Sequence, residues 1–187
     1  MVALAGPFSV READTGFAGL VRVVAGQQVS AQAARSIWLR VAALPGVREP
    51  DGLLQLSEAE LRGAGLSGAK VRTARTIAEA MLAGELRLDL VDQMPAEDAI
   101  AHMTRLKGIG PWSAEIYLLF AARHPDVFPS GDLALQIAAQ WALGWDARPV
   151  PKQLSLEAAR WAPYRSTAAL LFWAYYAAKK AREGLSV

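Results

Sequence analysis

The chain has 187 residues, of which 53% are hydrophobic, and its 20 Lys and Arg against 18 Asp and Glu leave a net charge of only +2. This length and hydrophobicity suffice for one domain, or for two small lobes, with a well-buried core. The absence of Cys excludes disulfides, thiolate nucleophiles, Cys-ligated zinc and iron–sulfur clusters. Two His residues are too few for most zinc sites, and the weak net charge means that a polyanionic partner must be bound by local groups.

The N-terminus lacks a basic start followed by an apolar core and a small-residue cleavage site, and no apolar run is long enough to cross a membrane. We therefore expect a soluble, cytoplasmic protein with no membrane partner.

Helical spacing of apolar residues recurs along the chain, and no segment shows sustained alternation of period two. The start signals include Asp14-Thr15 and Ser30 as N-caps, a Ser57–Glu60 capping box, and proline at the first helical position. The expected helices cover residues 16–25, 30–42, 57 to 63 or 65, 95–105, 112–123, 133–143, 155–161 and 163–183, with a longer helix that begins at Ser67 and has an inward stripe through Met81. The sequence predicts an all-α fold of about eight to ten helices joined by short turns.

Two helices in the middle of this order are joined by a glycine-flanked hairpin, Leu106-Lys107-Gly108-Ile109-Gly110-Pro111-Trp112-Ser113-Ala114. Such a turn can aim several backbone N–H groups in one direction, which suits an anion such as a phosphate. The loop of residues 124–131 then delivers Asp132 to the start of another apolar helix.

The hairpin and the later Asp126-Val127-Phe128-Pro129-Ser130-Gly131-Asp132-Leu133 together resemble the helix-hairpin-helix DNA glycosylase superfamily. Three further blocks resemble its alkylated-base branch, DNA-3-methyladenine glycosylase II: Gly26-Gln27-Gln28-Val29-Ser30, Gly65-Leu66-Ser67-Gly68-Ala69-Lys70, and Trp161-Ala162-Pro163-Tyr164-Arg165-Ser166 with Trp173 beyond. The resemblance covers nearly the whole chain, and it is to a compact helical form without the N-terminal α/β domain of the bacterial archetype.

This resemblance implies a two-lobed fold with the active site in the cleft between the lobes. We expect one glycosylase unit over residues 1–187, with one lobe of residues 50–123 and another of residues 1–49 plus 124–187. The implied partner is double-stranded DNA with damaged bases, bound by a monomer that would be nucleoid-associated in a bacterium.

Asp132 matches the essential carboxylate of the superfamily. The base in an N-alkylated purine nucleotide is already cationic, so the developing charge lies on an oxocarbenium-like sugar, which a carboxylate stabilises while it orients or deprotonates water. An Asp before an apolar helix is ordinarily just an N-cap. In this motif order we expect Asp132 to be catalytic.

Trp112 stands where strand-cutting members of the superfamily carry a Lys, so the resemblance implies a monofunctional hydrolase without lyase activity. Trp112 and Trp173 match aromatic residues of the base pocket, where an indole attracts a cationic ring. Ile116 replaces the Tyr that is typical of the bacterial archetype, which predicts a roomier pocket. The other four tryptophans are assigned to core packing.

Contacts to DNA are also implied by position. Gln28, or else Gln27, matches the wedge that fills the gap left by a flipped base, although both amides could instead cap the following helix. Phosphate contacts are expected from Gly108, Gly110, Lys107 and Arg165. The reaction requires no cofactor, and a structural Na⁺ or K⁺ is expected on the backbone carbonyls of Thr104, Leu106 and Ile109.

Two other classes of function compete with this hypothesis. A non-enzymatic helix-hairpin-helix DNA-binding module would need Gly108 and Gly110 but not Asp132. Within the superfamily, a glycosylase for deaminated or oxidised bases is the rival; the absence of Cys disfavours its cluster-bearing branches, and Trp112 in place of Lys disfavours its strand-cutting ones. The sequence does not rank the alkylated and deaminated bases, because that order depends on pocket shape at the level of a methyl group.

Overall fold

The structure is a computed structural model that describes residues 1–7, 13–91 and 93–182. Within these ranges the chain forms eleven α-helices and one 3₁₀ helix, η1, and no β-strand, so the predicted all-α class is confirmed. None of the described helices is both long enough and apolar enough to span a membrane. The chain divides into two compact units, residues 13–122 and residues 1–12 plus 123–187.

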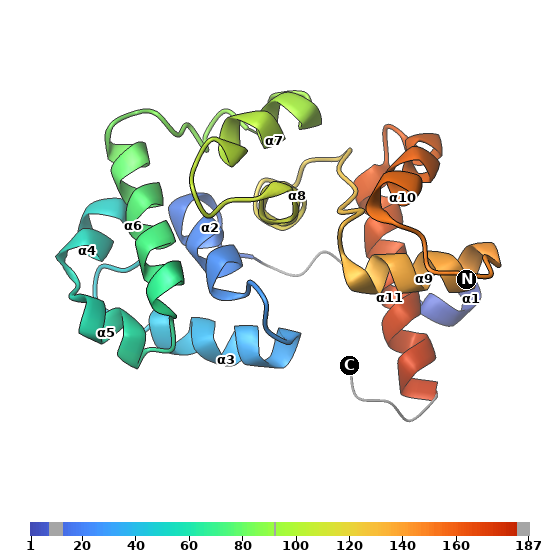
Figure 1. Cartoon of the computed structure of the whole chain (residues 1–187), viewed down its shortest axis with the longest axis horizontal. Helices are drawn as coiled ribbons and strands as arrows, with labels where there is room; N and C mark the ends of the chain where they lie inside the picture. Colours follow the sequence, from blue (N-terminus) through green and yellow to red (C-terminus); the bar gives the residue numbers. More distant parts are fainter. Residues whose placement is uncertain (8–12, 92, 183–187) are drawn as a thin grey trace. The chain divides into compact units, whose positions relative to one another are not determined.

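The first unit, residues 13–122, is built around α6, the blue-green helix of Figure 1. The helix α6 packs against α2, α4 and α5, while α8 packs against α2 and α7. The bounds of its helices are α2 Gly16–Ala25, α3 Ala31–Val41, α4 Pro50–Gln55, α5 Glu58–Gly63, α6 Gly68–Leu82, α7 Ala96–Thr104 and α8 Pro111–Phe120.

The core of this unit follows the predicted helical stripes. Fully buried side chains come from α2, α4, α5, α6, α7 and α8, and the largest are Leu20, Leu53, Leu61, Ile77, Met103, Tyr117 and Leu118. Ser30 and Ser57 each accept the predicted N-cap hydrogen bond from a backbone N–H, and Ser57 and Glu60 form the reciprocal capping box. Ser67 caps α6 in the same way, whereas Thr15, the N-cap of α2, makes no side-chain cap hydrogen bond.

The second unit, residues 1–12 plus 123–187, is built on the long helix α11, which packs against α1 and α9. Its elements are α1 Val2–Ala5, α9 Leu133–Leu143, α10 Pro151–Ala158, η1 Ala159–Trp161 and α11 Arg165–Arg182. Phe128, Trp161 and Phe172 form an aromatic cluster in this unit, with ring centroids 5.0 to 6.0 Å apart. Gly144 ends α9 in the left-handed conformation, with φ of 69°.

Several boundaries differ from the sequence prediction. Residues 13–49 belong with the middle helices, whereas we expected them with the C-terminal part, because α2 buries its apolar face on α6 and α8. The helix α10 begins at Pro151 rather than being capped by Ser155, since proline is favoured at the first helical position. The short helices α1 and α4 were not predicted, and the expected end of the last helix at Glu183 lies outside the described residues.

Candidate active site

Asp132 is the N-cap of α9, and its carboxylate is oriented by two N–H groups. The Oδ1 atom accepts a hydrogen bond from the backbone N–H of Leu135 at 3.1 Å and another from the indole Nε1–H of Trp173 at 3.0 Å. Two expected site residues from different helices of one unit, Asp132 and Trp173, are thus in direct contact. The side chain has both a local capping role and a partner on α11, and a simple N-cap needs only the first.

The loop before Asp132 is held in shape by its own backbone and by α9. The N–H of Ser130 donates to Phe128 O at 2.7 Å, and the N–H of Asp132 donates to Pro129 O at 2.9 Å. The buried Gln136 donates from Nε2 to Ser130 O at 2.9 Å. This loop therefore presents Asp132 from an ordered turn, and Gln136 is a supporting residue that the sequence analysis missed.

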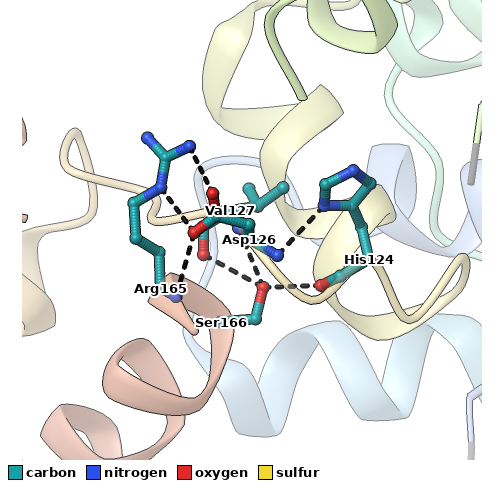
Figure 2. A network of polar contacts seen from close by, with 5 residues as sticks. All are labelled: His124, Asp126, Val127, Arg165 and Ser166. Atoms are coloured by element: carbon teal, nitrogen blue, oxygen red, sulfur yellow. Dashed lines mark hydrogen bonds and ion pairs between the residues drawn. The ribbon is translucent and has the colours of Figure 1, made fainter. Parts of the chain in front are cut away.

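The beginning of the same loop is tied to the first turn of α11 (Figure 2). Arg165 faces the carboxylate of Asp126, with Nε to Oδ1 at 2.7 Å and Nη2 to Oδ2 at 2.8 Å. This guanidinium holds the pKa of Asp126 below its usual range. We expected Arg165 to contact a DNA phosphate, but two of its nitrogen atoms are occupied by an intramolecular carboxylate.

The hairpin between α7 and α8 depends on Gly108. Its φ of +96° is in the left-handed half of the map, and a Cβ there would lie 2.1 Å from Oγ1 and 2.9 Å from Cβ of Thr73. Gly110 is the N-cap of α8 with φ of −92°, and a Cβ there meets nothing within 4 Å. Lys107 is exposed, as a phosphate contact requires.

Gln27 and Gln28, the two wedge candidates, differ sharply in environment. Gln27 is half-buried and donates from Nε2 to Gly108 O at 3.0 Å and to Ser113 Oγ at 2.8 Å. Gln28 is exposed and has a φ of 56°, which is uncommon for a residue other than glycine. The connection between α2 and α3, called the α2–α3 corner, is also stabilised by Lys70. Its Nζ donates to Ala25 O at 2.8 Å, and burial lowers its pKa.

The remaining expected pocket residues lie on α8. Trp112 and Ile116 are one turn apart and both are half-buried. They belong to the unit of residues 13–122, and Asp132 and Trp173 belong to the other.

The backbone of the hairpin bears on the expected cation site. The N–H of Ile109 donates to Leu106 O at 3.1 Å, which uses one of the two lone pairs of that carbonyl. No group of three or more acidic or His side chains suited to a metal ion occurs among the described residues. A cation on the backbone carbonyls of Thr104, Leu106 and Ile109 stays a prediction from the sequence.

Comparison with known proteins places the chain in a family. Residues 21–163 match the HhH-GPD superfamily base excision DNA repair proteins, so the chain belongs to that superfamily of DNA glycosylases. Within it, the chain falls in the 3-methyladenine glycosylase branch, which confirms the resemblance drawn from the sequence motifs.

Three relatives illustrate this similarity. The DNA-3-methyladenine glycosylase 1 of Schizosaccharomyces pombe is 27% identical over 158 residues, which cover 82% of this chain and 69% of that protein. Its structure in complex with abasic DNA matches with a TM-score of 0.83, covering 91% of this chain and 86% of that one. A DNA-3-methyladenine glycosidase from Bacillus halodurans matches at 32% identity with a TM-score of 0.80, covering 98% and 84% of the two chains. The putative DNA-3-methyladenine glycosylase YfjP of Bacillus subtilis is 31% identical over 67% of this chain, which spans only 44% of that protein.

Proposed function

We propose that this protein is a monofunctional DNA glycosylase that excises N3- and N7-methylated purines from double-stranded DNA and leaves an abasic site. The observation that carries the proposal is the carboxylate of Asp132, which is held at the start of α9 by Leu135 and Trp173. Membership of the base excision repair superfamily and similarity to 3-methyladenine glycosylases support the same function.

The proposed reaction is hydrolysis of the N-glycosidic bond. The bond between C1′ and the base nitrogen breaks, and its electron pair leaves with the alkylated base, which thereby loses its positive charge. The carboxylate of Asp132 stabilises the oxocarbenium-like sugar and orients a water molecule. The water oxygen bonds to C1′, and its proton passes to the carboxylate and then to solvent. No cofactor takes part in these steps, and the cation on the hairpin carbonyls would have a structural role.

The proposed pocket uses aromatic rather than amine chemistry. An indole face of Trp112 attracts a cationic purine by an interaction of about 2 kcal/mol when it is desolvated. A tryptophan has no amine that could form a Schiff base with C1′, so strand cleavage at this position is not expected. Ile116 lies one turn further on α8 and is smaller than tyrosine, which supports a permissive pocket.

DNA binding is assigned to groups of the hairpin and the α2–α3 corner. The N–H groups of Gly108 and Gly110, together with exposed Lys107, are proposed to bind the phosphate backbone. Gln28 is proposed as the wedge, because its side chain is exposed and its strained backbone is typical of functional positions. Gln27 is instead assigned to support of the hairpin.

The test is release of free base from methylated duplex DNA. Wild-type protein is expected to release methylated purines, and the DNA strand should break only after alkali converts the abasic sites. Strand cleavage without alkali would contradict the monofunctional assignment. Tight DNA binding without release of any base would favour a DNA-binding module, and release from only deaminated or oxidised DNA would change the substrate class.

A further inference from the structure

The long helix α11 contacts the segment that carries Asp132 at two separate places. Near its first residue, Arg165 and Ser166 bind the backbone and side chain of residues 124–127. About two helical turns later, Trp173 donates to Asp132 itself at 3.0 Å. One rigid helix therefore fixes both the beginning of this loop and the carboxylate at its end.

The contact at the start of α11 is a bidentate ion pair between Arg165 and Asp126, with an additional backbone hydrogen bond. The planar guanidinium of Arg165 meets both carboxylate oxygens of Asp126, and the backbone N–H of Arg165 donates to Oδ1 at 3.2 Å. The side chains of Arg165 and Asp126 are only 29% and 21% exposed. Such a fork fixes orientation as well as distance, and partial burial protects it from screening by salt.

Ser166 adds the backbone part of the anchor (Figure 2). Its N–H donates to Pro125 O at 3.1 Å, and its hydroxyl oxygen accepts from the N–H of Val127 at 3.0 Å. The hydroxyl hydrogen donates to His124 O at 2.6 Å, with Val127 O at 3.1 Å as a second acceptor. This serine is buried, so the backbone groups of residues 124–127 form hydrogen bonds with the first turn of α11 rather than with water.

We propose that Arg165, acting through Asp126, is a positioning residue for Asp132. The pair fixes where the loop of residues 124–132 lies along α11. The inference rests on the proposed function and refines it. Without the pair, the start of the loop keeps the Ser166 contacts but loses the bidentate contact that fixes its orientation on α11, so the carboxylate at its other end is placed less accurately relative to Trp173. A misplacement of about 1 Å at a reacting group can reduce a rate by about 100-fold.

This role differs from a phosphate contact in its kinetic and binding signature. A phosphate contact contributes to affinity for DNA, and its loss makes that affinity less sensitive to salt. A positioning residue leaves affinity unchanged and reduces the rate of the chemical step. It also becomes redundant once its partner is removed, because the two residues act as one unit.

The first experiment is a double-mutant cycle of Asp126→Asn and Arg165→Gln. Single-turnover base release is measured at saturating protein, and the Kd for an abasic-site duplex is measured at several salt concentrations. We expect each single variant to slow release by about 10- to 100-fold, and the double variant to be no slower than the slower single. The Kd and its salt dependence should stay within twofold of wild type.

The opposite pattern would overturn the proposal. If Arg165→Gln weakens binding and flattens its salt dependence while release at saturation stays at the wild-type rate, Arg165 is a phosphate contact. Additive losses of rate in the double variant would also contradict a role through Asp126. Far-UV circular dichroism confirms that each variant is folded at the assay temperature, and Arg165→Lys keeps the charge as a milder second variant. Because lysine cannot form the fork, we expect Arg165→Lys to have an intermediate rate.

The second experiment reads the position of Asp132 without any substrate. The indole ¹H–¹⁵N resonance of Trp173, assigned by its loss in Trp173→Phe, reports the hydrogen bond to Asp132. It should shift in Asp126→Asn and in Arg165→Gln. It should not shift in Asp89→Asn, which breaks a comparable but exposed two-pronged pair with Arg87 in the other unit.

An unchanged Trp173 resonance in both Asp126→Asn and Arg165→Gln would refute the positioning role of Arg165. Failure of wild-type protein to release any base would instead refute the proposed function, and the resonance would then decide the anchoring of the loop alone.

Discussion

At the scale of single residues, the important feature is that one oxygen of Asp132 receives both oriented N–H groups. The bond from Leu135 is the ordinary N-cap interaction, so it fixes the carboxylate relative to α9. The bond from Trp173 comes from another helix and fixes the plane of the carboxylate relative to α11. Asp132 is therefore pre-oriented before any substrate binds, as transition-state stabilisation requires.

The variant Trp173→Phe tests this orientation. It keeps an aromatic ring and removes the N–H that donates to Oδ1, so we expect single-turnover base release to fall by about tenfold, with abasic-DNA affinity changed less than threefold. Single-turnover kinetics and fluorescence anisotropy measure the two quantities. A rate equal to that of wild type would show that the indole N–H has no role in placing the carboxylate.

The two glutamines of the α2–α3 corner predict different phenotypes. Replacing Gln28 by Gly relieves a left-handed backbone, which should raise the free energy of unfolding by up to about 1 kcal/mol, yet it removes the proposed wedge. Base flipping, followed by 2-aminopurine fluorescence, should weaken in Gln28→Gly and be largely kept in Gln28→Asn. Unchanged flipping in Gln28→Gly would exclude Gln28 as the wedge.

Gln27→Ala should behave in the opposite way, because Gln27 supports the hairpin. It removes donors to Gly108 O and Ser113 Oγ, so we expect a loss of about 1–2 kcal/mol in urea unfolding. Stability equal to that of wild type would show that these hydrogen bonds contribute nothing.

At the scale of elements, the hairpin offers a matched pair of glycines. Gly108→Ala places a Cβ against Thr73 and forces alanine to a φ of +96°, which should cost about 2–4 kcal/mol and weaken DNA binding. Gly110→Ala meets no neighbour and has an ordinary φ, so it should change stability by less than about 1 kcal/mol. Urea unfolding measures the free energy of unfolding of both variants. An equal loss in the two would contradict a special backbone requirement at Gly108.

Element boundaries show what local sequence signals can specify. The caps at Ser30 and Ser57 were predicted correctly because a side chain and a nearby N–H suffice to form them. The start of α10 was misplaced because both Pro151 and Ser155 are valid start signals, and packing rather than local chemistry decides between them. The short helix α4 has one buried side chain, Leu53, and gives too few apolar repeats for a periodic pattern.

At the scale of the whole molecule, the sequence predicted which residues form helices far better than it predicted which helices pack against one another. Residues 13–49 carry clear amphipathic stripes, but a stripe does not specify which helix will cover it, and α2 packs with α6 and α8. The same limit applies to the site. The sequence singled out Asp132 and Trp173 as candidates, but their contact, and the pairing of Arg165 with Asp126, depend on residues that are far apart in the chain.

Both compact units contain a carboxylate whose pKa is lowered by basic partners. Burial raises the pKa of Asp14, but hydrogen bonds from Arg48, Arg22 and Trp38 outweigh it and lower the pKa overall. Asp126 is held low chiefly by Arg165. Because each folded-state pKa lies below the unfolded value of about 3.9, the stabilisation is complete above about pH 5 and is lost as the pH falls further.

Urea unfolding between pH 6 and pH 3 measures this effect. In the wild type the free energy of unfolding should decrease as the pH is lowered. The dependence of this free energy on pH should be weaker in Asp14→Asn and in Asp126→Asn. Slopes identical to that of wild type in both variants would contradict a stabilising role for these carboxylates.

The proposed function depends above all on Asp132, which we propose performs the chemistry of base release. The most direct measurement compares wild type and Asp132→Asn in single-turnover release of methylated purines, with affinity for an abasic-site duplex measured in parallel. We expect Asp132→Asn to slow release by at least about 100-fold and to bind the abasic duplex within a few-fold of wild type. Release at the wild-type rate by Asp132→Asn would contradict the proposal.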